Sequence, residues 1–185
     1  MRVLSVFLLI CAPAMADTAP CGGSVIAKAY TKALAECASL AKEGSAEAQF
    51  YLGLMYSNGY GDAQDKALAE SWYKKAADQG LATAEYNLGV MYYRGEGIPK
   101  DWALAVSWFR KAADQGFAAA QFNLGVMYYR GEGVPKDWVL AYMWANLAAA
   151  TTEQDQKLRD DLEKLMTPSQ IAESQKLSRE WKPKN

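Results

Sequence analysis

The chain has 185 residues, and its 20 Lys and Arg nearly balance its 21 Asp and Glu, giving a formal net charge of −1 at pH 7. A balance this even excludes the basic surface that binding to nucleic acid phosphates requires. The absence of histidine excludes Ser-His-Asp and Cys-His catalysis and removes the commonest metal ligand, so we expect no metal and no cofactor.

The first 16 residues are typical of an export signal peptide. Met1-Arg2 is a short basic start, residues 3–12 are apolar but too few to span a bilayer, and Ala14-Met15-Ala16 is a cleavage site. Cleavage after Ala16 leaves Asp17 as the mature start. No later apolar run is long enough for a membrane span. From the signal we predict an exported protein, and we favour the periplasm over a secreted or a lipid-anchored form.

A lipoprotein signal is the alternative to ordinary cleavage, with Cys11 as the acylated residue. Leu8 suits such a signal, but the residue before the cysteine should be small, and here it is Ile10. We therefore favour cleavage after Ala16 over a lipid-anchored form.

Residues 17–44 are predicted to form a leader and an N-terminal capping helix. The Pro and Gly residues within 17–23 predict a mobile leader. Ser24 is a candidate N-cap for a helix over about 25–43. By its register with the repeats that follow, this helix takes the place of the second helix of an incomplete repeat.

The mature chain keeps two cysteines, Cys21 and Cys37. An even pair in an oxidising compartment favours a disulfide. If the helix begins near Ser24, however, Cys37 lies roughly 20 Å along it at about 1.5 Å per residue. A bridge then forms only if Cys21 folds back along the helix or the helix begins later, and otherwise Cys37 is a small buried core residue. The sequence leaves both interpretations open, and we assign neither cysteine a catalytic role.

An internal repeat organises the rest of the chain. The segment Leu-Gly-Val-Met-Tyr-Tyr-Arg-Gly-Glu-Gly at 88–97 returns at 124–133, and a looser copy lies at 52–61, so that successive copies are 36 residues apart. Self-similarity at this period is typical of stacked structural repeats. We place three repeats at 45–80, 81–116 and 117–152.

Each repeat is predicted to contain two helices. The first helices span about 46–57, 82–93 and 118–129, and the second helices span about 66–79, 102–115 and 138–150. Three sets of residues mark them: mid-helix glycines that indicate close helix approach, glycines that end the first helix in the left-handed conformation, and aspartates that cap the second. In order, these are Gly53, Gly89 and Gly125; Gly59, Gly95 and Gly131; and Asp65, Asp101 and Asp137.

The last repeat ends differently from the others. Its second helix loses the charged residues of the earlier copies over 142–150 and is apolar on all sides, so another element must cover it. We predict that residues 153–185 form a C-terminal capping helix pair. Thr152 is the candidate cap of the first of these helices. Thr167-Pro168-Ser169-Gln170 is a capping box that opens the second.

The pattern A-x-x-x-L-G-x-x-Y, then G-x-G, D and A-x-x-W-[YF]-x-K-A-A-x-Q-G, resembles the Sel1-like repeat, a relative of the tetratricopeptide repeat. The resemblance covers about 45–181 and departs from the pattern at Ala63 and Lys66, which casts doubt only on the rigidity of the first loop. It implies an all-α fold, an α/α superhelical solenoid of helix-turn-helix repeats with a concave groove lined by the first helices. Members of the family generally act as adaptors, signalling regulators, or envelope and host-interaction factors.

A second stripe lies opposite the buried face of each first helix. It is either an aromatic groove for a protein or peptide or the packing surface between successive first helices. We favour packing for Leu54, Val90 and Val126, because aromatic rather than aliphatic residues mark recognition surfaces. In the related tetratricopeptide repeats an asparagine on this face can bind a ligand. For Arg94 and Arg130, the alternative to binding a partner is that the side chain is solvated or hydrogen-bonds to carbonyls of the last helical turn. The candidate protein-binding residues are Phe50, Tyr86, Asn87, Tyr93, Arg94, Phe122, Asn123, Tyr129 and Arg130.

No catalytic residue stands out from the repeat. The Arg-Gly-Glu-Gly loops lack the preceding strand and the Gly-Lys-Ser/Thr ending of a phosphate-binding loop. The acidic residues of 153–163 are expected to form the solvent-exposed face of an amphipathic helix. We therefore expect a non-enzymatic protein-interaction module. The alternatives are an envelope enzyme that acts on cell-wall peptide or glycan, and a structural scaffold without a groove ligand.

Overall fold

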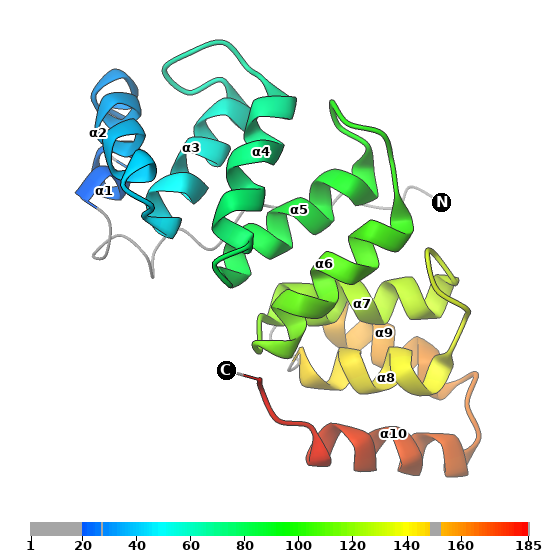
Figure 1. Ribbon diagram of the computed structural model, residues 1–185. Helices are drawn as coiled ribbons and strands as arrows, with labels where there is room; N and C mark the ends of the chain where they lie inside the picture. The colour runs from blue at the N-terminus through cyan, green and yellow to red at the C-terminus, as the bar shows by residue number, and fades with distance from the viewer. Residues whose placement is uncertain (1–19, 27, 149–152, 185) are drawn as a thin grey trace. The chain divides into compact units, whose positions relative to one another are not determined.

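A computed structural model describes residues 20–26, 28–148 and 153–184, and these residues form ten helices and no strand (Figure 1). The all-α prediction is confirmed, as is the packing of consecutive helices in pairs. The chain divides into two compact units, one that ends at Ala76 and one that begins at Ala77. The predicted signal peptide lies outside the described residues. Within those residues, every helix is too short or too polar to cross a membrane.

The first unit contains α1 (Pro20–Ile26), α2 (Tyr30–Lys42), α3 (Ala46–Asn58) and α4 (Lys66–Ala77) up to its last residue. Helix α2 packs against α3, and α1 packs against both. Ser45 caps α3, because its hydroxyl accepts a hydrogen bond from the amide of Ala48 at 3.2 Å. The core of this unit joins α2, α3 and α4 through small and aromatic side chains, among them Ala33, Ala48, Leu52, Met55 and Tyr73.

The N-terminal prediction was wrong in its helix boundaries. Residues 20–26 are helical, so the part of the predicted mobile leader that the structure describes forms α1. The single helix predicted over 25–43 is interrupted before Tyr30, where Lys28 adopts a left-handed φ of 58°. Ser24 does not cap a helix; its hydroxyl instead donates a hydrogen bond to the carboxylate of Glu36 at 2.8 Å.

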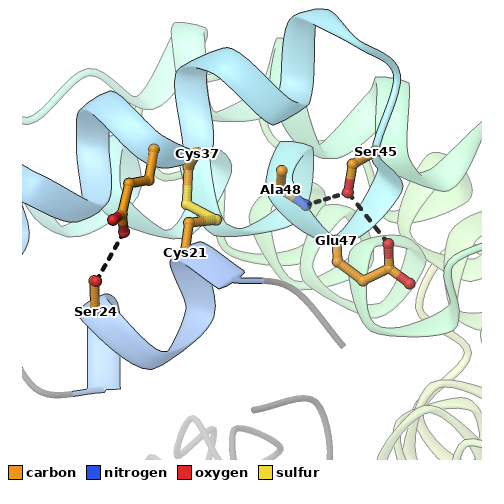
Figure 2. The surroundings of a disulfide bond; sticks show 7 residues. Cys21, Ser24, Cys37, Ser45, Glu47 and Ala48 are labelled. Atoms are coloured by element: carbon orange, nitrogen blue, oxygen red, sulfur yellow. Dashed lines mark hydrogen bonds between the residues drawn. A yellow bond between two sulfur atoms is a disulfide. The ribbon is translucent and has the colours of Figure 1, made fainter. Parts of the chain in front are cut away.

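This interruption brings the two cysteines together. Helix α1 folds back onto α2, and Cys21 and Cys37 are joined by a disulfide with their Cα atoms 5.2 Å apart (Figure 2). Both cysteine side chains are fully buried. Of the two conditions that the sequence sets for a bridge, both are met: Cys21 folds back, and the long helix begins later than Ser24.

The second unit contains α5 (Ala82–Arg94), α6 (Trp102–Asp114), α7 (Ala118–Arg130), α8 (Trp138–Leu147), α9 (Glu153–Glu163) and α10 (Pro168–Glu180). Each of α5, α6 and α7 packs against the next helix, and α8 packs against both α9 and α10. Tyr142, Met143 and Trp144 of α8 are buried, which agrees with the prediction that another element covers this helix. The Thr167–Gln170 capping box that starts α10 is also confirmed. The predicted cap Thr152 lies outside the described residues.

The predicted starts of the repeat helices and the predicted ends of the first helices are confirmed, and they rest on local chemistry. The second helices end earlier than predicted: α4 ends at Ala77 and α8 at Leu147. Gly59, Gly95 and Gly131 close the first helices in the left-handed conformation, with φ of 70°, 70° and 74°. The carboxylate of Asp101 accepts a hydrogen bond from the amide of Leu104 at 2.9 Å, and Asp137 does the same for Leu140. These caps satisfy amides that a helix start leaves without a partner.

The mid-helix glycines lie where two helices of one repeat touch. A Cβ on Gly53 would lie 2.6 Å from the ring of Tyr73, and a Cβ on Gly89 would lie 2.5 Å from the ring of Phe109. The predicted close approach is therefore confirmed, and its partner is an aromatic ring of the second helix. A further contact was not predicted: a Cβ on Gly133 would lie 2.4 Å from the carbonyl oxygen of Trp102, so the loop after α7 rests on the start of α6.

Candidate functional site

The predicted binding residues of the first helices differ widely in exposure. In the first unit, Phe50 is only 7% exposed, and its ring centroid lies 5.4 Å from that of Tyr51 and 5.8 Å from that of Tyr73. Phe50 is thus a core residue of α3, and we leave it out of any binding surface.

Tyr86 of α5 packs between neighbouring helices. Its ring centroid lies 5.8 Å from that of Phe109, in the second helix of its own repeat, and 5.1 Å from that of Phe117, which precedes α7. Val90 is also packed against the core of the second unit. In α5, therefore, the stripe that the sequence offers as a groove is largely occupied by packing within the unit.

The two asparagines at one register position have different surroundings. The side-chain amide of Asn87 donates a hydrogen bond to the carbonyl of Thr83 at 2.7 Å and remains partly exposed. Asn123 is only 5% exposed, and its amide nitrogen has no hydrogen-bond partner among the described residues. Of the two, only Asn87 is partly exposed, so we keep Asn87 and leave Asn123 out.

Tyr93 and Arg130 are brought together, from α5 and from the end of α7. The Tyr93 hydroxyl donates a hydrogen bond to Oε2 of Glu132 at 3.0 Å, and Nη1 of Arg130 donates to the same hydroxyl at 3.1 Å. Burial and the neighbouring Glu132 carboxylate raise the pKa of Tyr93, so its hydroxyl stays protonated as the donor. Glu132 was not predicted from the sequence, although it follows Arg130 by two residues just as Glu96 follows Arg94.

The remaining candidates are partly or fully exposed. Nη1 of Arg94 lies 3.2 Å from a carboxylate oxygen of Glu96, in an ion pair at the surface. Phe122 and Tyr129 of α7 are half-buried, and Arg130 is exposed. Together these residues form what we call the first-helix surface: Asn87, Arg94, Phe122, Tyr129 and Arg130.

Arg110, on the second helix α6, was not singled out from the sequence. Its guanidinium donates a hydrogen bond to the hydroxyl of Tyr128 and lies 5.2 Å from the ring centroid of Trp144. Its cationic group is therefore used between α6, α7 and α8, where it holds aromatic side chains in place.

The described residues contain no group of three or more His, Cys, Asp or Glu that could hold a metal ion. The arrangement on the first-helix surface is one of aromatic rings, amides and guanidinium groups. Such groups bind by packing and hydrogen bonding, and Arg and aromatic residues are enriched at protein interfaces.

Comparison with known proteins identifies the repeats. Residues 46–81, 82–117 and 118–150 each match the family model for the Sel1 repeat. The structure is similar to that of a Sel1 repeat protein from Oxalobacter formigenes, with 32% sequence identity, a TM-score of 0.71, and coverage of 80% of this chain and 60% of that one. It is also similar to a protective antigen of uropathogenic Escherichia coli strains that displays an SLR fold, with 32% identity, a TM-score of 0.52, and coverage of 81% of this chain and 40% of that one.

This chain thus spans less than two thirds of the length of either similar structure. A search of the curated proteins finds no match.

Proposed function

Because the chain belongs to the Sel1 repeat family, whose repeats are protein-interaction modules, we propose that it is a non-enzymatic adaptor or regulator of the bacterial cell envelope. It binds a protein or a peptide through the first-helix surface. The observation that carries this proposal is the presence of three Sel1 repeats in register. Stacked repeats form an extended surface, and on it Arg94 and Arg130 recur at one register of α5 and α7, which suits an extended partner.

The composition of the first-helix surface supports a protein partner. It combines two arginines, two aromatic rings and one amide on α5 and α7 of the second unit. Arg94 and Arg130 each have an acidic neighbour, Glu96 and Glu132. A partner must therefore compete with these ion pairs. Surface ion pairs are worth only about 0–1 kcal/mol, so such competition is feasible.

Two observations support the envelope as the location. The first 16 residues have the basic start, apolar run and cleavage site of a signal peptide. In addition, Cys21 and Cys37 are bonded, and disulfides form and persist mainly in oxidising compartments such as the periplasm. N-terminal sequencing of the protein from a periplasmic fraction tests this part. A mature start at Asp17 is expected, and an intact Met1 in the cytosol would refute it.

Affinity capture from a periplasmic extract tests the binding surface. The test variant is Arg94→Ala/Phe122→Ala/Tyr129→Ala. The matched control is Trp102→Ala/Leu104→Ala, which removes two exposed apolar side chains from α6. We expect the test variant to lose the partners that the wild type enriches, and the control variant to keep them. Equal partner sets for all three proteins, each shown to be folded by circular dichroism, would refute the surface.

A further inference from the structure

A buried carboxylate stands in the second repeat where the first and third repeats have a buried glutamine. Nε2 of Gln49 donates a hydrogen bond to the carbonyl of Ala41 at 3.1 Å, and Nε2 of Gln121 donates to the carbonyl of Ala113 at 3.2 Å. Each glutamine thus ties the first turn of a first helix to the last turn of the preceding second helix. The residue at this register in the second repeat is Glu85.

The backbone around this position is the same in all three repeats. The amide of residue 85 bonds to the carbonyl of residue 81 at 3.1 Å, as the amide of residue 121 bonds to that of residue 117 at 3.1 Å. The carbonyls that correspond to one another are those of Ala41, Ala77 and Ala113, and each accepts the amide of the glycine three residues later, at 3.2, 2.9 and 2.9 Å. By register, the carbonyl of Ala77 is the counterpart, for Glu85, of the acceptors that Gln49 and Gln121 use.

The chemistry of Glu85 differs from that of glutamine in one respect. The amide of glutamine both donates and accepts hydrogen bonds at any pH. An ionised carboxylate only accepts them, and a carboxyl group donates one only when it is neutral. Glu85 is 4% exposed, and its Oε2 already accepts a hydrogen bond from Nε2 of Gln115 at 2.8 Å. A second acceptor, such as a main-chain carbonyl, can be bonded only by the neutral form.

The charged groups around Glu85 are few. On α6, the charge of Lys111 lowers the pKa of Glu85 and the charge of Asp114 raises it. The Asp114 carboxylate is itself paired with Nζ of Lys184 at 2.8 Å, and Asp78, in the turn before α5, is exposed. No arginine or lysine ion pair with Glu85 is formed among the described residues, so burial dominates and raises the pKa of this carboxyl group.

We propose that Glu85 is a pH-sensitive latch, which in its neutral form donates a hydrogen bond to the carbonyl of Ala77 and in its ionised form releases it. This goes beyond the proposed binding function and does not depend on it. In the released form the Glu85 side chain keeps its contact with Gln115 and gives up its bond to the end of the preceding second helix. The glutamines of the other two repeats cannot respond in this way, because an amide does not titrate.

The direction of the effect on stability follows from linkage. Because the pKa of Glu85 is higher in the folded chain than its ordinary value of 4.5, the folded chain binds the proton more tightly than the unfolded chain does. Protonated Glu85 therefore stabilises the folded chain; this contribution is fully present below about pH 4.5 and is lost as the pH rises through the pKa of the folded state. Each unit by which the pKa is raised changes the unfolding equilibrium constant about tenfold.

Two variants and one direct measurement test the latch. Urea unfolding of the wild type, Glu85→Gln and Gln121→Glu is followed between pH 4.5 and 8. Glu85→Gln is expected to be more stable than the wild type at pH 8, by a margin that shrinks toward pH 4.5. Gln121→Glu is expected to add the same pH dependence in the third repeat. The carboxyl carbon of Glu85 is also titrated by NMR in the wild-type protein.

A titration of Glu85 above its ordinary pKa, together with a pH-dependent difference between the wild type and Glu85→Gln, supports the proposal. A Glu85 carboxyl that titrates at the ordinary value would overturn it. So would a difference between the two proteins that stays constant from pH 4.5 to 8. The NMR titration needs no variant, so the test does not depend on the folding of Gln121→Glu.

Discussion

The two ends of the repeat array are closed in different ways, one covalently and one by packing. At the N-terminal end, α1 has seven residues and is held on α2 by the Cys21–Cys37 disulfide (Figure 2). Gly22 lies so close to Tyr51 that a Cβ would be 2.7 Å from its ring. At the C-terminal end, α10 has 13 residues and packs along α8 (Figure 1). Its Ser178 hydroxyl donates to the carbonyl of Met143 at 3.3 Å.

The difference follows from helix length. A helix of seven residues gains few backbone hydrogen bonds for the cost of its first turn, and it buries little apolar surface. It therefore depends on a cross-link that lowers the entropy of the unfolded chain. A helix of 13 residues with a capping box and an aromatic anchor buries enough surface to dock without one. Trp181 supplies that anchor, with its ring centroid 6.2 Å from that of Trp144.

The largest effect is expected when the packed end is removed. A chain that ends after Met166 lacks α10 and leaves the buried Trp144 of α8 uncovered. We expect the third repeat to lose about 3 kcal/mol of stability or more, because burial of one large apolar side chain contributes roughly 1.5–3 kcal/mol and Ile171, Leu177 and Trp181 would also leave the core. Near-UV circular dichroism and urea unfolding measure the loss. The control is a chain that ends after Trp181, which keeps α10. Equal stability of the two chains would contradict the role of α10.

The next largest effect is expected at the covalent end. The double variant Cys21→Ser/Cys37→Ser opens a loop with a sequence separation of 16, which costs about 3 kcal/mol on the chain-entropy estimate. The effect should be confined to the first unit, so hydrogen exchange is expected to speed up in α1, α2 and α3 and to stay unchanged in α7 and α8. Because both cysteines are buried, reductant should not change the folded wild type. Faster exchange in α8 of the double variant would show that the two ends are not independent.

A smaller effect is expected from the cap of α10. Thr167→Ala removes the hydroxyl that accepts a hydrogen bond from the amide of Gln170 at 3.3 Å. Loss of an N-cap side chain costs about 1 kcal/mol. Thermal unfolding of Thr167→Ala should show this loss, and Thr167→Ser, which keeps the hydroxyl, should not. If both variants unfold like the wild type, packing alone holds the C-terminal end.

The smallest effect is expected from the tail after α10. Lys184→Ala removes the ion pair with Asp114, in which the lysine side chain is 75% exposed. Exposed pairs are worth little, so we expect a change below about 0.5 kcal/mol in urea unfolding. Lys184→Arg serves as the control, because it keeps the charge. A loss as large as that of Thr167→Ala would mean that the tail is part of the C-terminal closure.

The parts of the fold that were predictable from sequence are those that depend on local chemistry repeated every 36 residues. Gly95 and Gly131 end helices, and Asp101 and Asp137 begin them, by contacts within a few residues. The interruption before Tyr30 was not predictable in this way. No Gly or Pro marks it, and Lys28 adopts its left-handed φ in a segment held by the disulfide and by the bond from Ser24 to Glu36.

The candidate site was less predictable because its contacts join distant residues. Tyr93 and Arg130 could be named from the repeat, but their meeting with Glu132 depends on how α5 and α7 lie in the second unit. The sequence also treats Asn87 and Asn123 alike, since they share a register position. Their exposure differs because the helices that pack around them differ, and a one-dimensional pattern does not contain that information.

The contact of Gly133 with the start of α6 has a consequence for how such a protein changes its length. The loop rests on main-chain atoms of Trp102 and Ala103, which every amino acid possesses, so the fit does not depend on a particular neighbouring side chain. An in-frame duplication of one internal copy would therefore supply both the glycine and the backbone it rests on. At this contact, therefore, a duplicated copy needs no compensating substitution in the repeat beside it.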